Sequence, residues 1–99
     1  MKLAWTPAAI ADRDRQADYI ARDSPRAAVE QFDRVESVLD VLAEHPQMGR
    51  RGRVRGTREL VVAGTPFVAV YRIKAKIRRI EILRLLHGAQ RWPPAHGRT

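Results

Sequence analysis

The sequence predicts an α+β fold: an N-terminal edge strand and an antiparallel helical hairpin packed on a three-stranded antiparallel meander, in the order β-α-α-β-β-β. Two observations predict it. Residues 57–87 form the one long stretch rich in β-branched and large apolar side chains, and residues 7–44 carry apolar side chains at helical spacing. Because 99 residues suffice for one core and not for two, we expect a single domain over residues 1–93 and a disordered tail at 94–99.

The stretch at 57–87 divides into three segments of strand length. Gly64-Thr65-Pro66 and Lys74-Ala75-Lys76 interrupt it, and connections this short force antiparallel hairpins. The middle segment, 67–73, is apolar at nearly every position, which is typical of a central strand. The last segment becomes apolar after Glu81 except at Arg84, whose side chain lies along apolar surface or lines a concave site.

An edge strand at 2–5 and two helices precede the meander. Thr6-Pro7 and Ser24-Pro25 each place a capping side chain before a proline, which is typical of a helix start. The first helix, at 7–22, has a narrow apolar stripe (Ile10, Ala17, Ile20, Ala21) and a charged opposite side (Asp12, Arg13, Asp14, Arg15, Asp18). The second helix, at 25–44, has a stronger stripe that we expect in the core: Ala28, Phe32, Val35, Leu39 and Leu42.

Composition excludes several classes of protein. Without cysteine the chain has neither disulfides nor thiolate zinc sites, and its three scattered histidines lack spaced carboxylate partners, so we expect no metal. No apolar run approaches the roughly 18 residues of a membrane span, and the N-terminus lacks a signal-peptide core. We therefore expect a cytoplasmic protein without membrane contact and without a cofactor.

Charge is distributed unevenly along the chain. The net charge is +8, yet residues 1–44 hold nine acidic and six basic residues, whereas residues 45–99 hold two acidic and thirteen basic residues. The segment 47–56, an expected loop, has four arginines and three glycines in ten residues. Guanidinium groups fit phosphate or carboxylate in two-point contacts, so this half suits a polyanion or an acidic protein. The alternative is a solvated connector and charge that serves solubility.

Several short motifs then occur in a fixed order: SPRAAVEQF in the second helix, HPQMGRRGRVRGTREL across the basic loop, and IEILRLLHGAQRWP at the end. In this order, and over residues 2–93, the chain resembles the RelE/ParE superfamily of type II toxin-antitoxin toxins. The resemblance implies a small toxin that halts growth and is neutralised by a cognate antitoxin. It also implies one of two targets. The ribonuclease branch cuts messenger RNA on the ribosome, and the ParE branch poisons DNA gyrase without being an enzyme.

An RNA-cutting site without metal needs a base, an acid and arginines around the phosphate. Glu59 or His87 could be base or acid, with Arg58, Arg84 and the loop arginines on the phosphate. By itself, however, a histidine such as His87 is more often a structural residue whose ring bonds to a nearby carbonyl. Tyr71 is a substitute acid or, in a central strand, a core residue. Ribonuclease-like relatives usually have an arginine before the Val-Tyr of the middle strand and an aromatic residue after the histidine. This chain has Val68 or Ala69 and then Gly88 there, which leaves the cleavage machinery incomplete.

We therefore expect a ParE-like toxin that inhibits by binding DNA gyrase, with a messenger-RNA interferase at the ribosome as the alternative. A nucleic-acid-binding module without toxicity is a third possibility. We expect one electropositive surface on a single side of the molecule to engage the target, with Trp92 as an aromatic anchor. Its residues are Arg50, Arg51, Arg53, Arg55, Arg58, Arg84, Arg91 and Trp92.

The expected partner is an acidic antitoxin segment that folds on binding and forms a hetero-oligomeric complex with the toxin. The narrow stripe of the first helix is the expected docking surface, through Ile10, Ala17 and Ile20. Arginines of the basic half would match the acidic side chains of that segment.

Overall fold

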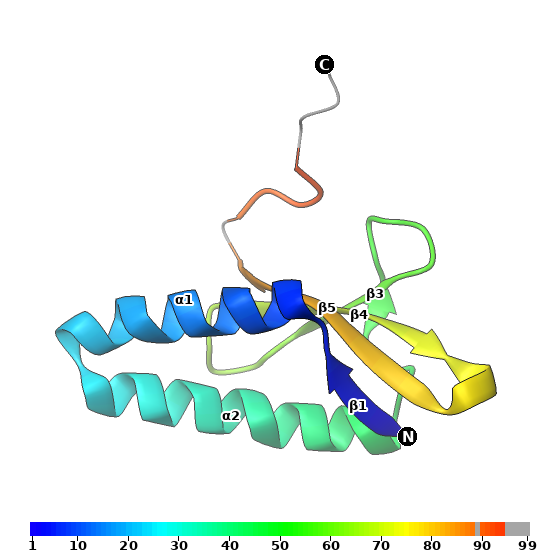
Figure 1. Cartoon of the computed structure of the whole chain (residues 1–99), viewed down its shortest axis with the longest axis horizontal. Coiled ribbons are helices and arrows are strands. Elements are labelled where there is room, and N and C mark those ends of the chain that lie inside the picture. Colours follow the sequence, from blue (N-terminus) through cyan, green and yellow to red (C-terminus); the bar gives the residue numbers. More distant parts are fainter. Residues whose placement is uncertain (89, 95–99) are drawn as a thin grey trace.

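A computed structural model describes residues 1–88 and 90–94 and confirms the α+β fold (Figure 1). Of the predicted tail, only Pro94 belongs to the described residues. The elements are β1 (Lys2–Trp5), α1 (Pro7–Asp23), α2 (Pro25–Glu44), β2 (Arg50–Arg51), β3 (Arg58–Val61), β4 (Phe67–Lys74), the 3-10 turn η1 (Ala75–Ile77) and β5 (Arg79–His87). The edge strand, both helices and all three strands of the meander lie where the sequence predicts them.

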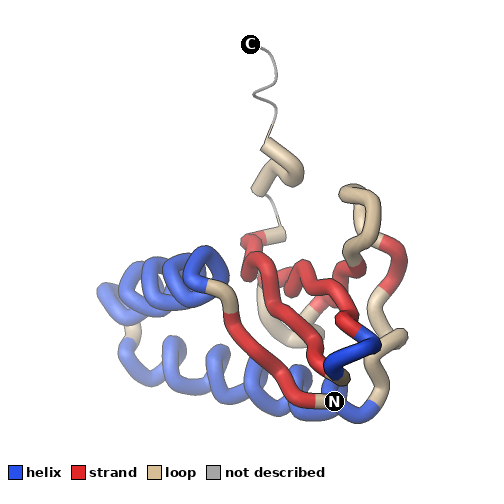
Figure 2. Tube along the Cα trace, turned by 45° about the vertical axis from the view of Figure 1, so that its right-hand side comes forward, coloured by secondary structure: helices blue, strands red, loops and turns tan. Residues whose placement is uncertain are grey.

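The helices begin where the sequence places a capping side chain before a proline. The Thr6 hydroxyl accepts a hydrogen bond from the backbone N–H of Ala9 at 3.3 Å, and the Ser24 hydroxyl accepts one from Ala27 at 3.0 Å. The proline that follows each cap occupies the first helical turn, where its missing N–H costs nothing. One serine thus ends α1 and starts α2, which sets the two helices side by side as a hairpin (Figure 2).

One five-stranded sheet carries the strands in the order β1-β5-β4-β3-β2. One edge of the sheet is β1, which pairs parallel with β5, with Lys2 opposite Arg79 and Trp5 opposite Ile82. The other edge is β2, a two-residue strand inside the segment that the sequence predicts to be a loop. Its antiparallel pairing with β3 turns residues 52–57 into the tip of a hairpin.

The apolar stripe of α2 fills the core, as predicted. Val35, Leu39 and Leu42 are buried against the sheet, and the ring of Phe32 lies 5.1 Å from that of Phe67. The prediction for α1 was wrong for Asp12, which the sequence places on the charged side of the helix. Its buried residues are Ala9 and Asp12, whereas Ile10, expected in the apolar stripe, is 36% exposed.

The sheet has two unlike faces, and the strand register decides from which face each charged side chain of the strands projects. Residues directly opposite each other in antiparallel strands project from the same face. The row Leu60, Ala69 and Leu85 belongs to the core beneath the helices, on what we call the helix-bearing face. The neighbouring row, Glu59, Val70 and Arg84, therefore projects from the opposite side, the outer face.

Candidate functional site

The outer face carries a carboxylate enclosed by two arginines. Glu59 is 2% exposed and accepts hydrogen bonds from the Nη2 atoms of Arg50 and Arg53, both at 3.0 Å, and from the backbone N–H of Arg53 at 2.9 Å. Burial alone would raise the pKa of Glu59, but these hydrogen bonds outweigh it and lower the pKa to about 2. Glu59 is thus ionised at neutral pH, with its oxygens already engaged. It also holds the side chains of Arg50 and Arg53 in place.

Arg84, the lone arginine late in β5, forms a second internal ion pair. Its Nε donates to Oδ2 of Asp12 at 2.7 Å and its Nη2 to Oδ1 at 2.9 Å, while the backbone N–H of Leu85 reaches the same carboxylate at 2.9 Å. Burial opposes ionisation of Asp12, but the bonds from Arg84 and Leu85 lower its pKa. The Arg84 guanidinium also lies 5.5 Å from the ring centre of Trp92, so the predicted aromatic anchor stacks on this arginine.

His87 lies apart from Glu59 and Arg84. It is directly opposite Phe67, a core residue, so it projects from the helix-bearing face, at the end of β5. There it lines a hollow of about 300 Å³ together with Tyr19 and Ile20 of α1. The structure therefore brings Glu59 and Arg84 onto one face and His87 onto the other. The three residues expected to cut RNA do not converge on one point.

Tyr71 is a core residue that fastens the basic hairpin to the end of α2. Its hydroxyl donates to the carbonyl of Pro46 at 2.7 Å and accepts from the backbone N–H of Gly49 at 3.0 Å. Burial raises the pKa of this hydroxyl. Of the two alternatives for Tyr71, the structure supports the core residue.

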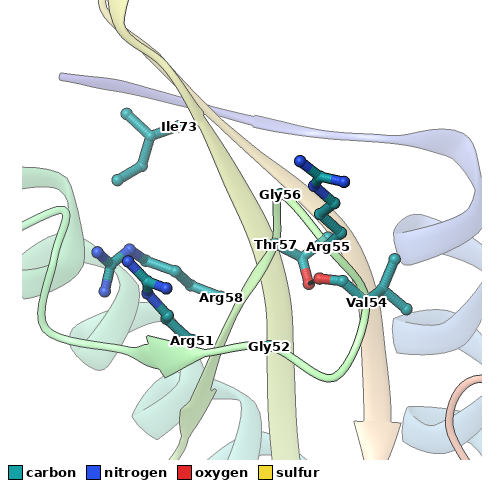
Figure 3. A pocket seen from close by; sticks show the side chains of 8 residues that line it. All are labelled: Arg51, Gly52, Val54, Arg55, Gly56, Thr57, Arg58 and Ile73. Carbon is teal, nitrogen blue, oxygen red and sulfur yellow. Dashed lines mark hydrogen bonds between the residues drawn. The ribbon is translucent and has the colours of Figure 1, made fainter.

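The remaining basic residues of the hairpin lie around a hollow of about 420 Å³ beside Ile73 (Figure 3). Arg51 is opposite Arg58, and Arg58 is opposite the core residue Tyr71, so this row belongs to the helix-bearing face. The expected single basic surface is thus divided between two faces, because neighbouring residues of a strand point in opposite directions. Arg91 is exposed beyond β5.

The three residues expected to bind an antitoxin form an uneven surface along α1. Ile10 is exposed, whereas Ala17 and Ile20 are half-buried and Ile20 also packs against the core. Tyr19, which the sequence did not single out, is the most exposed large apolar residue of α1, at 68%. It lines the His87 hollow beside Ile20, so this hollow extends the predicted surface toward the end of β5.

Metal-binding clusters and membrane-spanning helices are two further features that the described residues do not show. Within residues 1–88 and 90–94, no cluster of three or more histidine and carboxylate side chains could hold a metal ion. No helix in that part of the chain is long and apolar enough to cross a membrane.

Comparison with known proteins places this geometry in a family. Residues 3–92 match the family model described as the ParE toxin of the type II toxin-antitoxin system parDE. The chain belongs to the ParE toxin family. Among curated relatives, this ParE-family toxin is 41% identical to the putative toxin Y4kP of Sinorhizobium fredii over 92 residues, 93% of each chain. It is also 36% identical to toxin RelE2 of Caulobacter vibrioides over 89 residues, covering 90% of this chain and 97% of the relative.

Solved structures agree with the assignment. A chain from the chromosomal ParDE system of P. aeruginosa superimposes with a TM-score of 0.75 at 31% identity, over 88% of this toxin and 95% of that chain. A chain from the RelBE2 toxin-antitoxin complex of Mycobacterium tuberculosis superimposes with a TM-score of 0.63 at 25% identity, over 87% and 95%. The RelE/ParE resemblance predicted from the short motifs is therefore confirmed.

Asp12 is a second residue of this ParE-family toxin, besides Tyr19, whose role the sequence did not reveal. The sequence places it on the charged, solvent-facing side of the first helix, yet it is 2% exposed. The available signal was a lone arginine in an apolar strand, because a buried arginine needs a carboxylate partner. The sequence does not show which carboxylate pairs with Arg84, because Asp12 lies 72 residues away along the chain.

Proposed function

We propose that this toxin halts growth by binding DNA gyrase and not by cleaving RNA. One observation carries the proposal: His87 and Glu59, the candidate acid and base, project from opposite faces of the sheet. In addition, hydrogen bonds from Arg50 and Arg53 already occupy Glu59. The match to the ParE family supports the same conclusion, because resemblance to that branch implies gyrase as the target.

In this proposal the toxin acts as a rigid binding surface. The ion pairs fix Arg50, Arg53 and Arg84 in defined positions, so these guanidinium groups lose little side-chain entropy when they meet a partner. Arg50 and Arg53 line a hollow of about 500 Å³ on the outer face, between Val61, Val68 and Gly88. This hollow, together with Arg84 and the Trp92 ring that stacks on it, forms the proposed contact surface for gyrase.

A ribosome-dependent messenger-RNA interferase is the second candidate. The 36% identity to toxin RelE2 favours it. It requires a rearrangement that brings His87 and a second acid-base group to the same phosphodiester, since general acid-base catalysis needs both within hydrogen-bond reach of the reacting atoms. His87 is therefore the residue at which the two candidates differ most.

The deciding experiment induces wild-type toxin and His87→Ala in cells and follows plasmid supercoiling and transcript integrity in the same cultures. Gyrase binding predicts altered supercoiling with intact transcripts, and toxicity that survives His87→Ala. Codon-phased transcript cuts that disappear in His87→Ala would establish the interferase instead. Purified toxin added to a gyrase supercoiling reaction separates direct inhibition from secondary effects of growth arrest.

The proposed partner is a cognate antitoxin with an acidic, apolar segment that folds over α1, through Ile10, Ala17, Ile20 and the adjoining His87 hollow. The solved relatives from ParDE and RelBE2 systems support the existence of such a partner. Ile10→Asp tests the surface, because Ile10 is exposed and lies outside the core cluster. We expect weaker antitoxin binding by isothermal titration calorimetry and unchanged toxicity. Unchanged binding would move the docking surface elsewhere.

A further inference from the structure

The basic hairpin contains two sets of arginines that differ in how their charge is balanced. Arg50 and Arg53 share Glu59 on the outer face. On the helix-bearing face, Arg51 lies directly opposite Arg58, and the hollow they line contains no acidic residue among those described. Like charges directly opposite each other in a sheet destabilise it, so this second pair costs folding energy unless an anion neutralises it.

Hydrogen bonds within the hairpin hold the hollow beside Arg51 and Arg58 in shape. The Nη1 atom of Arg58 donates to the carbonyl of Gly49 at 2.7 Å, which fixes its guanidinium. The hairpin tip is closed by bonds from Gly52 N–H to the Thr57 carbonyl at 2.8 Å and from the Thr57 hydroxyl to the Val54 carbonyl. Gly56, with φ of 82°, supplies the left-handed turn that this closure needs.

The arrangement of the charges indicates what kind of anion fits. Figure 3 shows the side chains of Arg51 and Arg58 pointing the same way, while Arg55 extends on the other side of Gly56 and Thr57. Positive charges on both sides of the hairpin suit an extended ligand with negatively charged groups repeated along its length. A phosphodiester chain has this property, and a single side-chain carboxylate does not. Val54 and Ile73 add apolar wall against which sugars can lie.

We propose that Arg51, Arg55 and Arg58 form a binding site for the phosphodiester backbone of a nucleic acid. Arg51 and Arg58 supply the part of the site on the helix-bearing face, and Arg55 adds a third charge from the other side of the hairpin tip. The site is separate from the outer-face hollow of Arg50 and Arg53 proposed for gyrase. It rests on the proposed function only in assigning DNA as the ligand in cells. In that setting the hairpin would grip DNA beside the gyrase subunit that the outer face contacts, so that one small toxin engages both components.

The test compares two double variants that remove equal charge. Arg51→Gln with Arg55→Gln removes two exposed arginines of the site, neither of which forms an ion pair with a described residue, and leaves the fixed Arg58 in place. The control, Arg22→Gln with Arg26→Gln, removes two exposed arginines at the end of the helical hairpin, far along the chain from the site. Thermal melts that match wild type establish that both variants are folded.

Binding is measured by fluorescence anisotropy with a labelled DNA duplex and with a labelled single-stranded RNA, at several salt concentrations and without gyrase. For the site variant we expect affinity to fall about 10-fold or more near 0.1 M salt. The logarithm of the binding constant falls linearly with the logarithm of the salt concentration. We expect the magnitude of that slope to decrease by about 0.9 for each duplex phosphate that the variant no longer neutralises. The control should retain wild-type affinity. Weaker binding of the duplex assigns DNA as ligand, and weaker binding of RNA alone assigns RNA.

Equal losses of affinity in both variants, or none in the site variant, would overturn the proposal. A supercoiling assay on the same proteins keeps the two proposals apart. If wild-type toxin fails to inhibit gyrase while nucleic-acid binding still depends on Arg51 and Arg55, the proposed function fails and the site stands. If wild type inhibits gyrase and the site variant binds DNA normally, the site fails and the function stands.

Discussion

Arg84 and Asp12 form a two-point ion pair, at 2.7 and 2.9 Å, that joins the last strand to the first helix. The carboxylate is 2% exposed and also accepts from the backbone N–H of Leu85, so it fixes the side chain and the backbone of β5 together. An arginine that the sequence offers as a target contact is therefore first a structural residue. Arg84 can contact a target only through the part of its guanidinium that Asp12 does not engage, and Trp92 stacks on that guanidinium.

We predict that Asp12→Ala destabilises the toxin by about 3 kcal/mol, because it leaves the Arg84 guanidinium partly buried without its carboxylate. Urea denaturation of wild type and variant measures the difference. Asp14→Ala is the matched control, since Asp14 is exposed and its ion pair with Arg13 lies on the surface. Similar losses of stability in both variants would show that the buried pair has no special contribution.

We predict that Glu59 makes stability depend on acid pH. Its pKa falls from 4.5 to about 2 on folding, so its contribution is complete above pH 4.5 and is lost as the pH falls toward 2. The shift corresponds to about 3 kcal/mol. Glu59→Gln should therefore be less stable than wild type at pH 7, and the two should converge near pH 2. Parallel curves of unfolding free energy against pH would contradict the prediction.

We predict that Tyr71→Phe lowers stability by about 1–3 kcal/mol and leaves toxicity intact at permissive temperature. The change removes the donor to Pro46 and the acceptor for the buried N–H of Gly49. Tyr19→Phe, at an exposed position, should leave stability unchanged. Loss of toxicity in a folded Tyr71→Phe protein would point to a chemical role for the hydroxyl.

We predict that Gly56→Ala destabilises the toxin by about 1–2 kcal/mol through the backbone alone. No atom lies within 4 Å of the added Cβ, but the residue has φ of 82°. Gly56→Asn should be less destabilising, because asparagine adopts left-handed conformations more readily than alanine. Thermal melts compare the two. Equal Tm values for both variants and wild type would mean that the turn relaxes without cost.

The sequence predicts the elements of this toxin well because their signals are local. Thr6-Pro7, Ser24-Pro25 and the stripe of α2 each lie within one element, and all are confirmed. The site was harder to predict because its ion pairs are not local. Glu59 follows an arginine in a short strand. Nothing in that segment alone indicates that Arg50 and Arg53 will hydrogen-bond to its carboxylate.

Strand β2 explains the largest difference between prediction and structure. Two adjacent arginines in a loop would contribute to one basic surface, but in a strand they point to opposite faces. Arg50 therefore meets Glu59 while Arg51 lies opposite Arg58. A strand of two residues has no hydrophobic periodicity to reveal it, so only its pairing with β3 identifies it.

The parallel pairing of β1 with β5 affects the order in which this toxin can fold during synthesis. Lys2 leaves the ribosome long before its neighbour Arg79 exists, so the first strand waits for almost the whole chain. Asp12 likewise waits for Arg84, and its buried carboxylate has no counterion from β5 until then. A nascent toxin therefore cannot complete its sheet or its buried ion pair until β5 has been synthesised, so the finished fold is reached only at the end of translation.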